Sequence, residues 1–284
     1  MSRLFAYMGN DPARVACALY PARKTLVADA QDYEPPAQFD SWGIGFYQGE
    51  VLLQRRPKAP VEPVDFYAVA RELRTDVIVG HVRAGTVGKP KNENTHPFRF
   101  RSWLFAHHGT IPSFESVVKA KLLDAVPDFL RRNVRGQTDS EHLFHLLLGH
   151  LQKSQRIDDD SVSPDVVCDA LRATIAEIDE WSGERADFAM VATNGRILVG
   201  ARRGTNLQMM RVQSILDCPV CREATPAPGK PAKRVDHEHL RAVLLVADVP
   251  AAAANANKEL MRDVPDESFV AVAHDLSVKT LAIR

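Results

Sequence analysis

The stretch Met1-Ser2-Arg3-Leu4-Phe5-Ala6-Tyr7-Met8-Gly9 opens the chain, and we expect the fold to be organised around it. After Ser2, an alternating apolar run ends at a glycine, a pattern typical of a strand followed by a turn. Because Ser2 is small and hydroxylic, Met1 is expected to be removed. The hydroxyl would then share a residue with a free α-amine, whose ordinary pKa of roughly 7.7–8.0 suits a general base. Such a residue is a candidate nucleophile; the simpler alternative is an ordinary chain start.

Length and composition indicate a globular protein. The chain has 284 residues, of which 45% are hydrophobic and 25% charged, enough to bury a substantial core. Basic and acidic residues number 36 each, so no net charge favours nucleic acid or a membrane surface. No apolar run reaches the roughly 18 residues of a membrane span, and the start lacks a signal-peptide core. We therefore expect a cytoplasmic protein that binds neither nucleic acid nor membranes.

Apolar periodicity predicts strands towards both ends of the chain and helices in its middle. Thr138 or Asp139 would cap the central helix, and Asn194-Gly195 favours a two-residue type I′ turn between two strands. The expected helices cover residues 11–20, 66–73, 114–132, 139–153 and 164–180. The expected strands cover residues 3–8, 40–47, 51–54, 76–83, 103–106, 188–193, 196–200, 242–246, 268–273 and 277–283.

This order of elements is typical of a single α+β domain, here over residues 1–284. We expect a loop insertion near residues 218–238, where Pro, Ala, Lys and Gly are frequent. Residues 84–97 form a Gly/Asn/Pro-rich loop that is long enough to suspect a function.

Five ordered motifs point to a site, although each alone has a structural alternative. Arg83 could pair with a surface carboxylate, Asp139 could only cap a helix, and Gly109 could be a turn glycine. Together the motifs resemble those of the class II glutamine amidotransferases, in particular the stand-alone glutaminase-like members of this N-terminal-nucleophile hydrolase family. The resemblance covers nearly the whole chain and implies a four-layer αββα sandwich with the first strand near the active cleft. The motifs are MSRLF (1–5), DSWGIG (40–45), HVRAGT (81–86) with NTHPF (94–98), HHG (107–109) and TDSE (138–141).

The resemblance implies hydrolysis of the side-chain amide of glutamine or a γ-glutamyl conjugate, through an ester on Ser2 and without a cofactor. The planar Arg83 guanidinium would bind the substrate carboxylate, and Asp139 would bind its ammonium group. The Gly109 N–H and the side chain of residue 108 would stabilise the oxyanion. Three loop residues would support substrate binding: Thr86, Asn94 and His96.

Two residues depart from the family pattern at the reacting centre. Ser2 stands where the family has cysteine, and His108 stands where it has asparagine; losing one oxyanion donor typically costs about 10²–10³-fold in rate. Ser2 could be an introduced replacement for cysteine, or a native serine nucleophile. The third alternative is a catalytically silent protein that binds or senses a glutamine-like ligand. The sequence shows no synthetase domain that would use released ammonia. The protein could therefore form a homo-oligomer, act with a synthetase partner chain, or work as a plain hydrolase.

The four cysteines are too few for a disulfide scaffold at this length. Cys218 and Cys221 form a CxxC motif, and His237 and His239 follow it, so these four residues are weak candidates for a zinc site. A single CxxC with irregular histidine spacing favours a pair of reduced surface cysteines instead. The sequence alone therefore predicts no metal.

Overall fold

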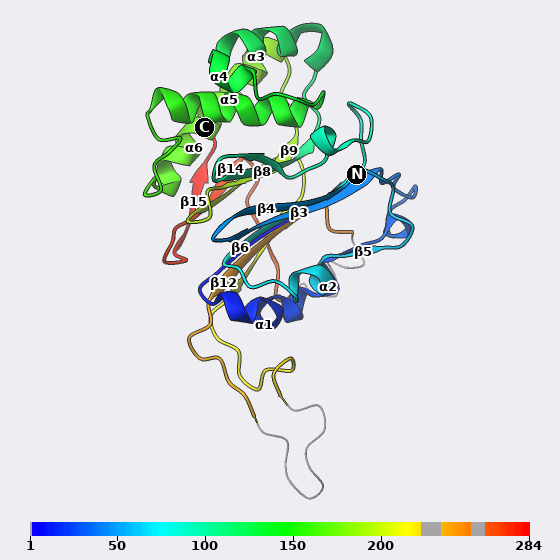
Figure 1. The fold of residues 1–284 in the computed structure, drawn as a ribbon, viewed down its shortest axis with the longest axis vertical. Helices are drawn as coiled ribbons and strands as arrows, with labels where there is room; N and C mark the ends of the chain where they lie inside the picture. Colours follow the sequence, from blue (N-terminus) through cyan, green and yellow to red (C-terminus); the bar gives the residue numbers. More distant parts are fainter. Residues whose placement is uncertain (1, 223–233, 251–258) are drawn as a thin grey trace, which may run out of the picture.

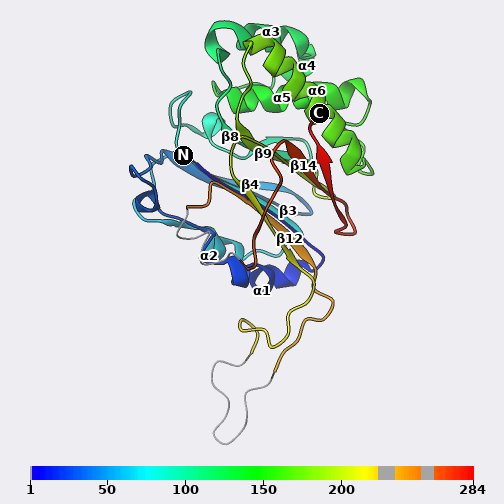
Figure 2. The ribbon, with the colours of Figure 1, turned by 180° about the vertical axis from the view of Figure 1, so that it is seen from behind.

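Two helical layers enclose two stacked β-sheets (Figure 1). The computed structural model describes residues 2–222, 234–250 and 259–284. Figure 2, the view from behind, shows the same order of layers. The αββα sandwich expected from the resemblance is therefore confirmed. Residues 223–233, which make up most of the expected insertion, lie outside the described residues.

The first sheet has seven strands, and β1 lies near its middle between β12 and β6. Both neighbours pair with β1 in antiparallel orientation, with Leu4 opposite Ala247 on one side and His81 on the other. The strand order is β13 (Arg262–Asp263), β11 (Leu207–Val212), β12 (Ala242–Ala247), β1 (Arg3–Gly9), β6 (Val77–Arg83), β3 (Ser41–Gln48) and β4 (Glu50–Arg56).

The second sheet has six strands and carries β8 next to β9. Its order is β15 (Val278–Ala282), β14 (Ser268–Val272), β10 (Leu198–Arg203), β9 (Phe188–Thr193), β8 (Trp103–Gly109) and β7 (Phe98–Phe100). A separate pair joins β2 (Val27–Ala28) to β5 (Val64–Asp65).

The larger helical layer covers the six-stranded sheet, and short helices cover the seven-stranded one (Figure 1). The large layer contains α3 (Lys119–Ala125), α4 (Asp128–Arg131), α5 (Asp139–Lys153) and α6 (Pro164–Ser182). The small layer contains α1 (Val15–Leu19) and α2 (Phe66–Ala70). None of the helices in the described part of the chain is both long and apolar enough to cross a membrane.

The core has three parts, one in each space between neighbouring layers. Leu4, Ala6 and Met8 of β1 pack between the two sheets, whereas Phe5 and Tyr7 pack towards α1 and α2. Both faces of β1 are therefore covered, which explains why every residue of this strand is buried.

Two expected elements differ in the structure. The single helix expected over residues 114–132 is a π-helical turn followed by α3 and α4, because Pro127 cannot donate the hydrogen bond that would continue α3. The two-residue turn at Asn194 is instead a four-residue loop, since Thr193 pairs with Leu198. The Asn194 side chain holds this loop by accepting hydrogen bonds from the N–H groups of Arg196 and Ile197.

A close approach of β6 to the Phe5 ring gives the first prediction. A Cβ at Gly80 would lie 2.0 Å from the Phe5 ring, so Gly80→Ala must displace this fully buried side chain. Overpacking of this kind costs about 1–3 kcal/mol of unfolding free energy. Urea unfolding of the variant should show this loss.

Gly149→Ala is the matched control. Its Cβ would meet only Pro127, at 3.6 Å, inside α5. Alanine favours a helix interior over glycine by roughly 0.5–1 kcal/mol, so this change should be neutral or stabilising. Equal losses in both variants would contradict the packing described here.

Candidate active site

Ser2 immediately precedes β1 and is buried beside the end of β6. Arg3 pairs with Val82, so the register brings Ser2 next to the last residues of β6. The Ser2 Oγ accepts a hydrogen bond from the Ala84 N–H at 3.0 Å. Ser2 continues the alternation of Leu4, which packs between the sheets. The hydroxyl is thereby held at the end of the space between the two sheets.

A cavity of about 30 Å³ surrounds this hydroxyl. Nearly all the site residues expected from the sequence converge on it, from both sheets, the loop after β6 and the start of α5. Its lining consists of Ser2, His81, Arg83, Ala84, Gly85, Thr86, Val87, His96, His107, His108, Gly109, Thr138, Asp139 and Ser140.

Asn94 is the expected site residue that does not line the cavity. It is fully buried, donates from Nδ2 to the Lys89 carbonyl at 2.8 Å, and accepts the Gln137 N–H at 2.7 Å. Asn94 thus ties residues 84–90, here called the 84–90 loop, to the segment before α5. Its place fits a supporting role rather than direct contact with a ligand.

The Arg83 guanidinium is already engaged by protein acceptors. Its Nη1 lies 2.5 Å from Asp40 Oδ2, and its Nη2 donates to the Val87 and Gly88 carbonyls of the 84–90 loop. Asp40 precedes β3, whose pairing of Ser41 with Arg83 brings the two charges together. The fork expected to bind a carboxylate is therefore partly occupied in this arrangement.

Asp139 is the first residue of α5, where a carboxylate is favoured by the helix dipole. Its Oδ2 accepts the Ile111 N–H at 3.0 Å, and its Oδ1 accepts the Ser140 N–H at 2.8 Å. Thr138 caps the helix by accepting the Glu141 N–H at 3.2 Å, as expected. The carboxylate is thus fixed in direction by backbone donors on both sides.

His108 and Gly109 end β8 beside Ala189 and Phe188 of β9. Gly109 has a φ of +150°, and a Cβ there would lie 2.5 Å from the Asp187 carbonyl, so a side chain at this position would be strained. Burial lowers the pKa of His108, although nearby Asp248 opposes the effect. A neutral imidazole keeps one N–H donor, which is the requirement for an oxyanion contact.

Three further histidines of the cavity wall are uncharged near pH 7. His81 and His96 are buried and stacked with ring centroids 4.2 Å apart. Burial, together with the neighbouring cations and histidines, holds the pKa of both well below the usual value. Burial also lowers the pKa of His107 to about 4, and its Nδ1 lies 2.9 Å from Ser140 Oγ.

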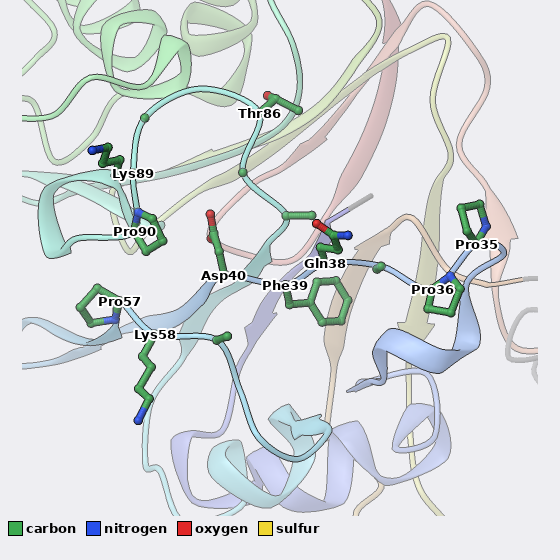
Figure 3. A pocket seen from close by; sticks show the side chains of 15 residues that line it. Pro35, Pro36, Gln38, Phe39, Asp40, Pro57, Lys58, Thr86, Lys89 and Pro90 are labelled. Atoms are coloured by element: carbon green, nitrogen blue, oxygen red, sulfur yellow. The ribbon is translucent and has the colours of Figure 1, made fainter.

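A much larger cavity of about 980 Å³ lies next to the small one. The two share Ala84, Gly85 and Thr86 as a common wall. Figure 3 shows that its lining comes from residues 35–40, 57–59 and the 84–90 loop. Ligand pockets usually measure roughly 300–1,000 Å³, so the cavity of about 30 Å³ at Ser2 is too small to hold an amino acid in this arrangement.

The model of the class II glutamine amidotransferases matches residues 1–215 of the chain. The chain belongs to this family. It is 26% identical over 200 residues to the "Probable glutamine amidotransferase DUG3" of Saccharomyces cerevisiae, covering 65% of this chain and 56% of that protein. It is 33% identical over 141 residues to the gamma-glutamyl-hercynylcysteine sulfoxide hydrolase of Mycobacterium tuberculosis, covering 44% of this chain and 59% of that protein. The chain therefore spans less than two thirds of either relative.

Solved structures of this family's fold agree with the architecture. A glutamine aminotransferase class-II domain protein from Silicibacter pomeroyi superposes with a TM-score of 0.55 at 17% identity, over 99% of both chains. The allosteric regulatory enzyme of purine biosynthesis superposes with a TM-score of 0.57 at 13% identity, over 99% of this chain and 49% of that one. At these identities the likeness supports the fold alone.

Sequence reasoning assigned no site role to several residues that lie here. His81, His107, Thr138 and Ser140 line the cavity, and their places within the motifs could have suggested it. Asp40 also lies within a motif, but nothing in the sequence indicates its pairing with Arg83, 43 residues away.

Because the buried histidines are neutral in the folded protein, we expect the protein to lose stability in acid. Their pKa values lie below the ordinary 6.5, so the unfolded chain binds more protons once the pH falls below that value. Stability that is present above pH 6.5 is therefore lost as the pH falls towards 4. For His145 on α5, which does not line the cavity, burial lowers the pKa to about 4, and this corresponds to roughly 3 kcal/mol.

Urea unfolding of the His145→Gln variant at pH 7 and pH 4.5 checks this prediction. The variant should lose less stability between the two pH values than the unchanged protein. An identical pH dependence of stability in the two proteins would count against a neutral buried His145.

Proposed function

We propose that this class II amidotransferase hydrolyses γ-glutamyl amides with Ser2 as its nucleophile, once Met1 has been removed. The observation that supports this most is the convergence of Ser2, Arg83, Gly109 and Asp139 on one cavity. These residues come from four separate elements, and each offers the chemistry that one part of a γ-glutamyl substrate requires.

In the proposed reaction the α-amine of Ser2 takes the hydroxyl proton while Oγ attacks the γ-carbonyl. The new C–O bond gives a tetrahedral oxyanion near the Gly109 N–H and the His108 imidazole. The C–N bond then breaks, and the protonated α-amine gives its proton to the leaving amine. Water hydrolyses the glutamyl ester by the same steps and regenerates Ser2.

Asp139 and Arg83 would hold the charged ends of the substrate. Asp139 presents a carboxylate for the α-ammonium group, and Arg83 presents a guanidinium for the α-carboxylate. The Arg83 Nη2 would have to exchange the carbonyls of Val87 and Gly88 for the substrate. Movement of the 84–90 loop would make this exchange and enlarge the small cavity in a single step.

The neighbouring cavity favours a leaving group larger than ammonia. This cavity of about 980 Å³ is separated from the Ser2 cavity by residues 84–86. A substituent on the leaving amine could extend into it while the glutamyl part of the substrate stays at Arg83 and Asp139. Lys58, Lys89 and Phe39 line this space (Figure 3). One of the relatives named above is a hydrolase of a γ-glutamyl conjugate, which is consistent with this choice.

The second candidate function is ligand binding without turnover. It is favoured by the contacts that occupy the Arg83 guanidinium. The resemblance to the family also implies that Ser2 and His108 depart from the usual residues at the reacting centre. A binding protein would keep the residues that hold the amino acid and lose those that perform the chemistry.

Ser2 variants separate these two functions. Aniline release from a γ-glutamyl anilide should fall on the order of 10³-fold or more in Ser2→Ala, because the ester cannot form. Ser2→Cys should remain active, since a thiol is the stronger nucleophile. Intact mass should show that Met1 is absent from the active protein.

Three results would contradict the proposal. Activity retained in Ser2→Ala would exclude Ser2 as the nucleophile. If neither the unchanged protein nor Ser2→Cys releases product, yet glutamine raises the Tm, the binding function is the correct one. If only Ser2→Cys is active, residue 2 is an inactivating replacement.

Arg83→Lys tests the carboxylate contact. Lysine keeps the charge but loses the planar fork, so KM should rise roughly 10–100-fold with a smaller change in kcat. Arg203→Lys is the matched control, because Arg203 is equally buried and pairs with Asp179 at 2.5 and 2.6 Å away from the cavity. Equal effects of the two variants on KM would reduce Arg83 to a structural role.

A further inference from the structure

Three cysteines and one histidine converge on the side of the seven-stranded sheet that carries α1. Cys17 lies on α1, Cys218 and Cys221 follow β11, and His237 precedes β12. Their sulfur and imidazole nitrogen atoms all lie within 4.8 Å of one another. This cluster, here called the Cys17 cluster, contains three of the four cysteines of the chain.

The cluster corrects part of the sequence interpretation. Cys218 is fully buried within the apolar core beneath the sheet, so the CxxC motif is not a pair of surface cysteines. Cys17 was not expected to take part, because 201 residues separate it from Cys218. His239, one of the expected candidates, is exposed and absent from the cluster.

The backbone around the cluster is held in place. His237 and Ile215 exchange two hydrogen bonds, at 2.7 and 3.1 Å. The Cys218 N–H donates to the Val235 carbonyl at 2.7 Å, and its carbonyl accepts the Arg222 N–H at 3.0 Å across the CxxC turn. Backbone hydrogen bonds therefore join the segment that carries Cys218 to the segment that carries His237.

One buried nitrogen atom of the cluster lacks a hydrogen-bond partner among the described residues. The His237 Nε2 is buried, and no group in the described part of the chain forms a hydrogen bond with it. A buried imidazole nitrogen without a partner is unfavourable, and a metal ion would satisfy it. A disulfide between Cys17 and Cys221, whose sulfurs lie 3.4 Å apart, would leave this nitrogen as it is.

We propose that Cys17, Cys218, Cys221 and His237 bind a structural zinc ion. Zinc prefers four tetrahedral sulfur and nitrogen ligands at about 2.0–2.3 Å, which places neighbouring ligand atoms roughly 3.5 Å apart. Two zinc-bound sulfurs would lie about 3.8 Å apart, close to the 3.4 Å between the Cys17 and Cys221 sulfurs, and all four ligand atoms lie within 4.8 Å of one another. Binding releases the three thiol protons and leaves the site with one net negative charge.

Arg14 supplies the compensating charge. Its Nη1 lies 3.3 Å from Cys221 Sγ, close enough to donate to a zinc-bound thiolate. Four protein ligands leave no open position for substrate or water, so the ion is structural rather than catalytic. Cys17 and Cys218 belong to the core on the face of the sheet that carries α1 and α2, whereas Ser2 continues the alternation of Leu4, which packs on the opposite face. The zinc fastens the segments on both sides of residues 223–233 to α1.

Metal content of the full chain tests the proposal. Protein purified without chelators should contain one zinc per chain by elemental analysis. After exchange, cobalt(II) should give the visible bands of a tetrahedral thiolate site. Chelation of zinc should lower the Tm by more than about 5 °C. Zinc far below one per chain, together with no tetrahedral cobalt spectrum in the reduced protein, would overturn the proposal, as would a Cys17–Cys221 disulfide in metal-free protein.

Matched variants identify the ligands. Cys221→Ser and His237→Asn should each lose zinc and change the cobalt spectrum. Cys168→Ser, at a buried cysteine in the helical layer, and His239→Asn should keep both. Zinc retained in both ligand variants would exclude the assigned site. If a ligand variant fails to fold, the zinc content and cobalt spectrum of the unchanged protein still decide the outcome.

Discussion

The antiparallel pairing of β1 with β6 is the interaction on which the rest of the site depends. Arg3 opposite Val82 brings Ser2 beside the Ala84 N–H, which donates to the Ser2 hydroxyl at 3.0 Å. Because side chains alternate along a strand, a slip of one residue would turn Ser2 towards α1 and α2. Apolar packing on both faces of β1 opposes such a slip, so the core of the sandwich also positions the proposed nucleophile.

Few charged side chains line the cavity around this nucleophile. Histidines that line the cavity are kept neutral by burial, whereas Arg83 and Asp139 supply one charge of each sign. Arg83 is buried against Asp40 and the 84–90 loop, so the cation remains paired while the cavity is small. Binding of a γ-glutamyl substrate would replace these partners with a carboxylate. Movement of the 84–90 loop would therefore both free the Arg83 guanidinium for the substrate and enlarge the cavity.

Much of the fold and site could be predicted from sequence, and the remainder could not for identifiable reasons. Local signals located β1, the helix at 139–153 and its Thr138 cap, and motif order located the residues around Ser2. The Arg83–Asp40 pair depends on β3 lying beside β6, a long-range pairing that no local pattern encodes. Cys17 joins the CxxC motif for the same reason, across 201 residues. Tertiary contacts, rather than propensities, decide these features.

Trapping the covalent intermediate tests the proposed role of the chain terminus most directly. The protein would be mixed with a γ-glutamyl amide, quenched in acid and digested, and the N-terminal peptide analysed by mass spectrometry. We expect a peptide that begins at Ser2 and carries one glutamyl group as an ester on the hydroxyl. Product formation with Met1 still attached, or with the glutamyl group on a different residue, would contradict the proposed nucleophile.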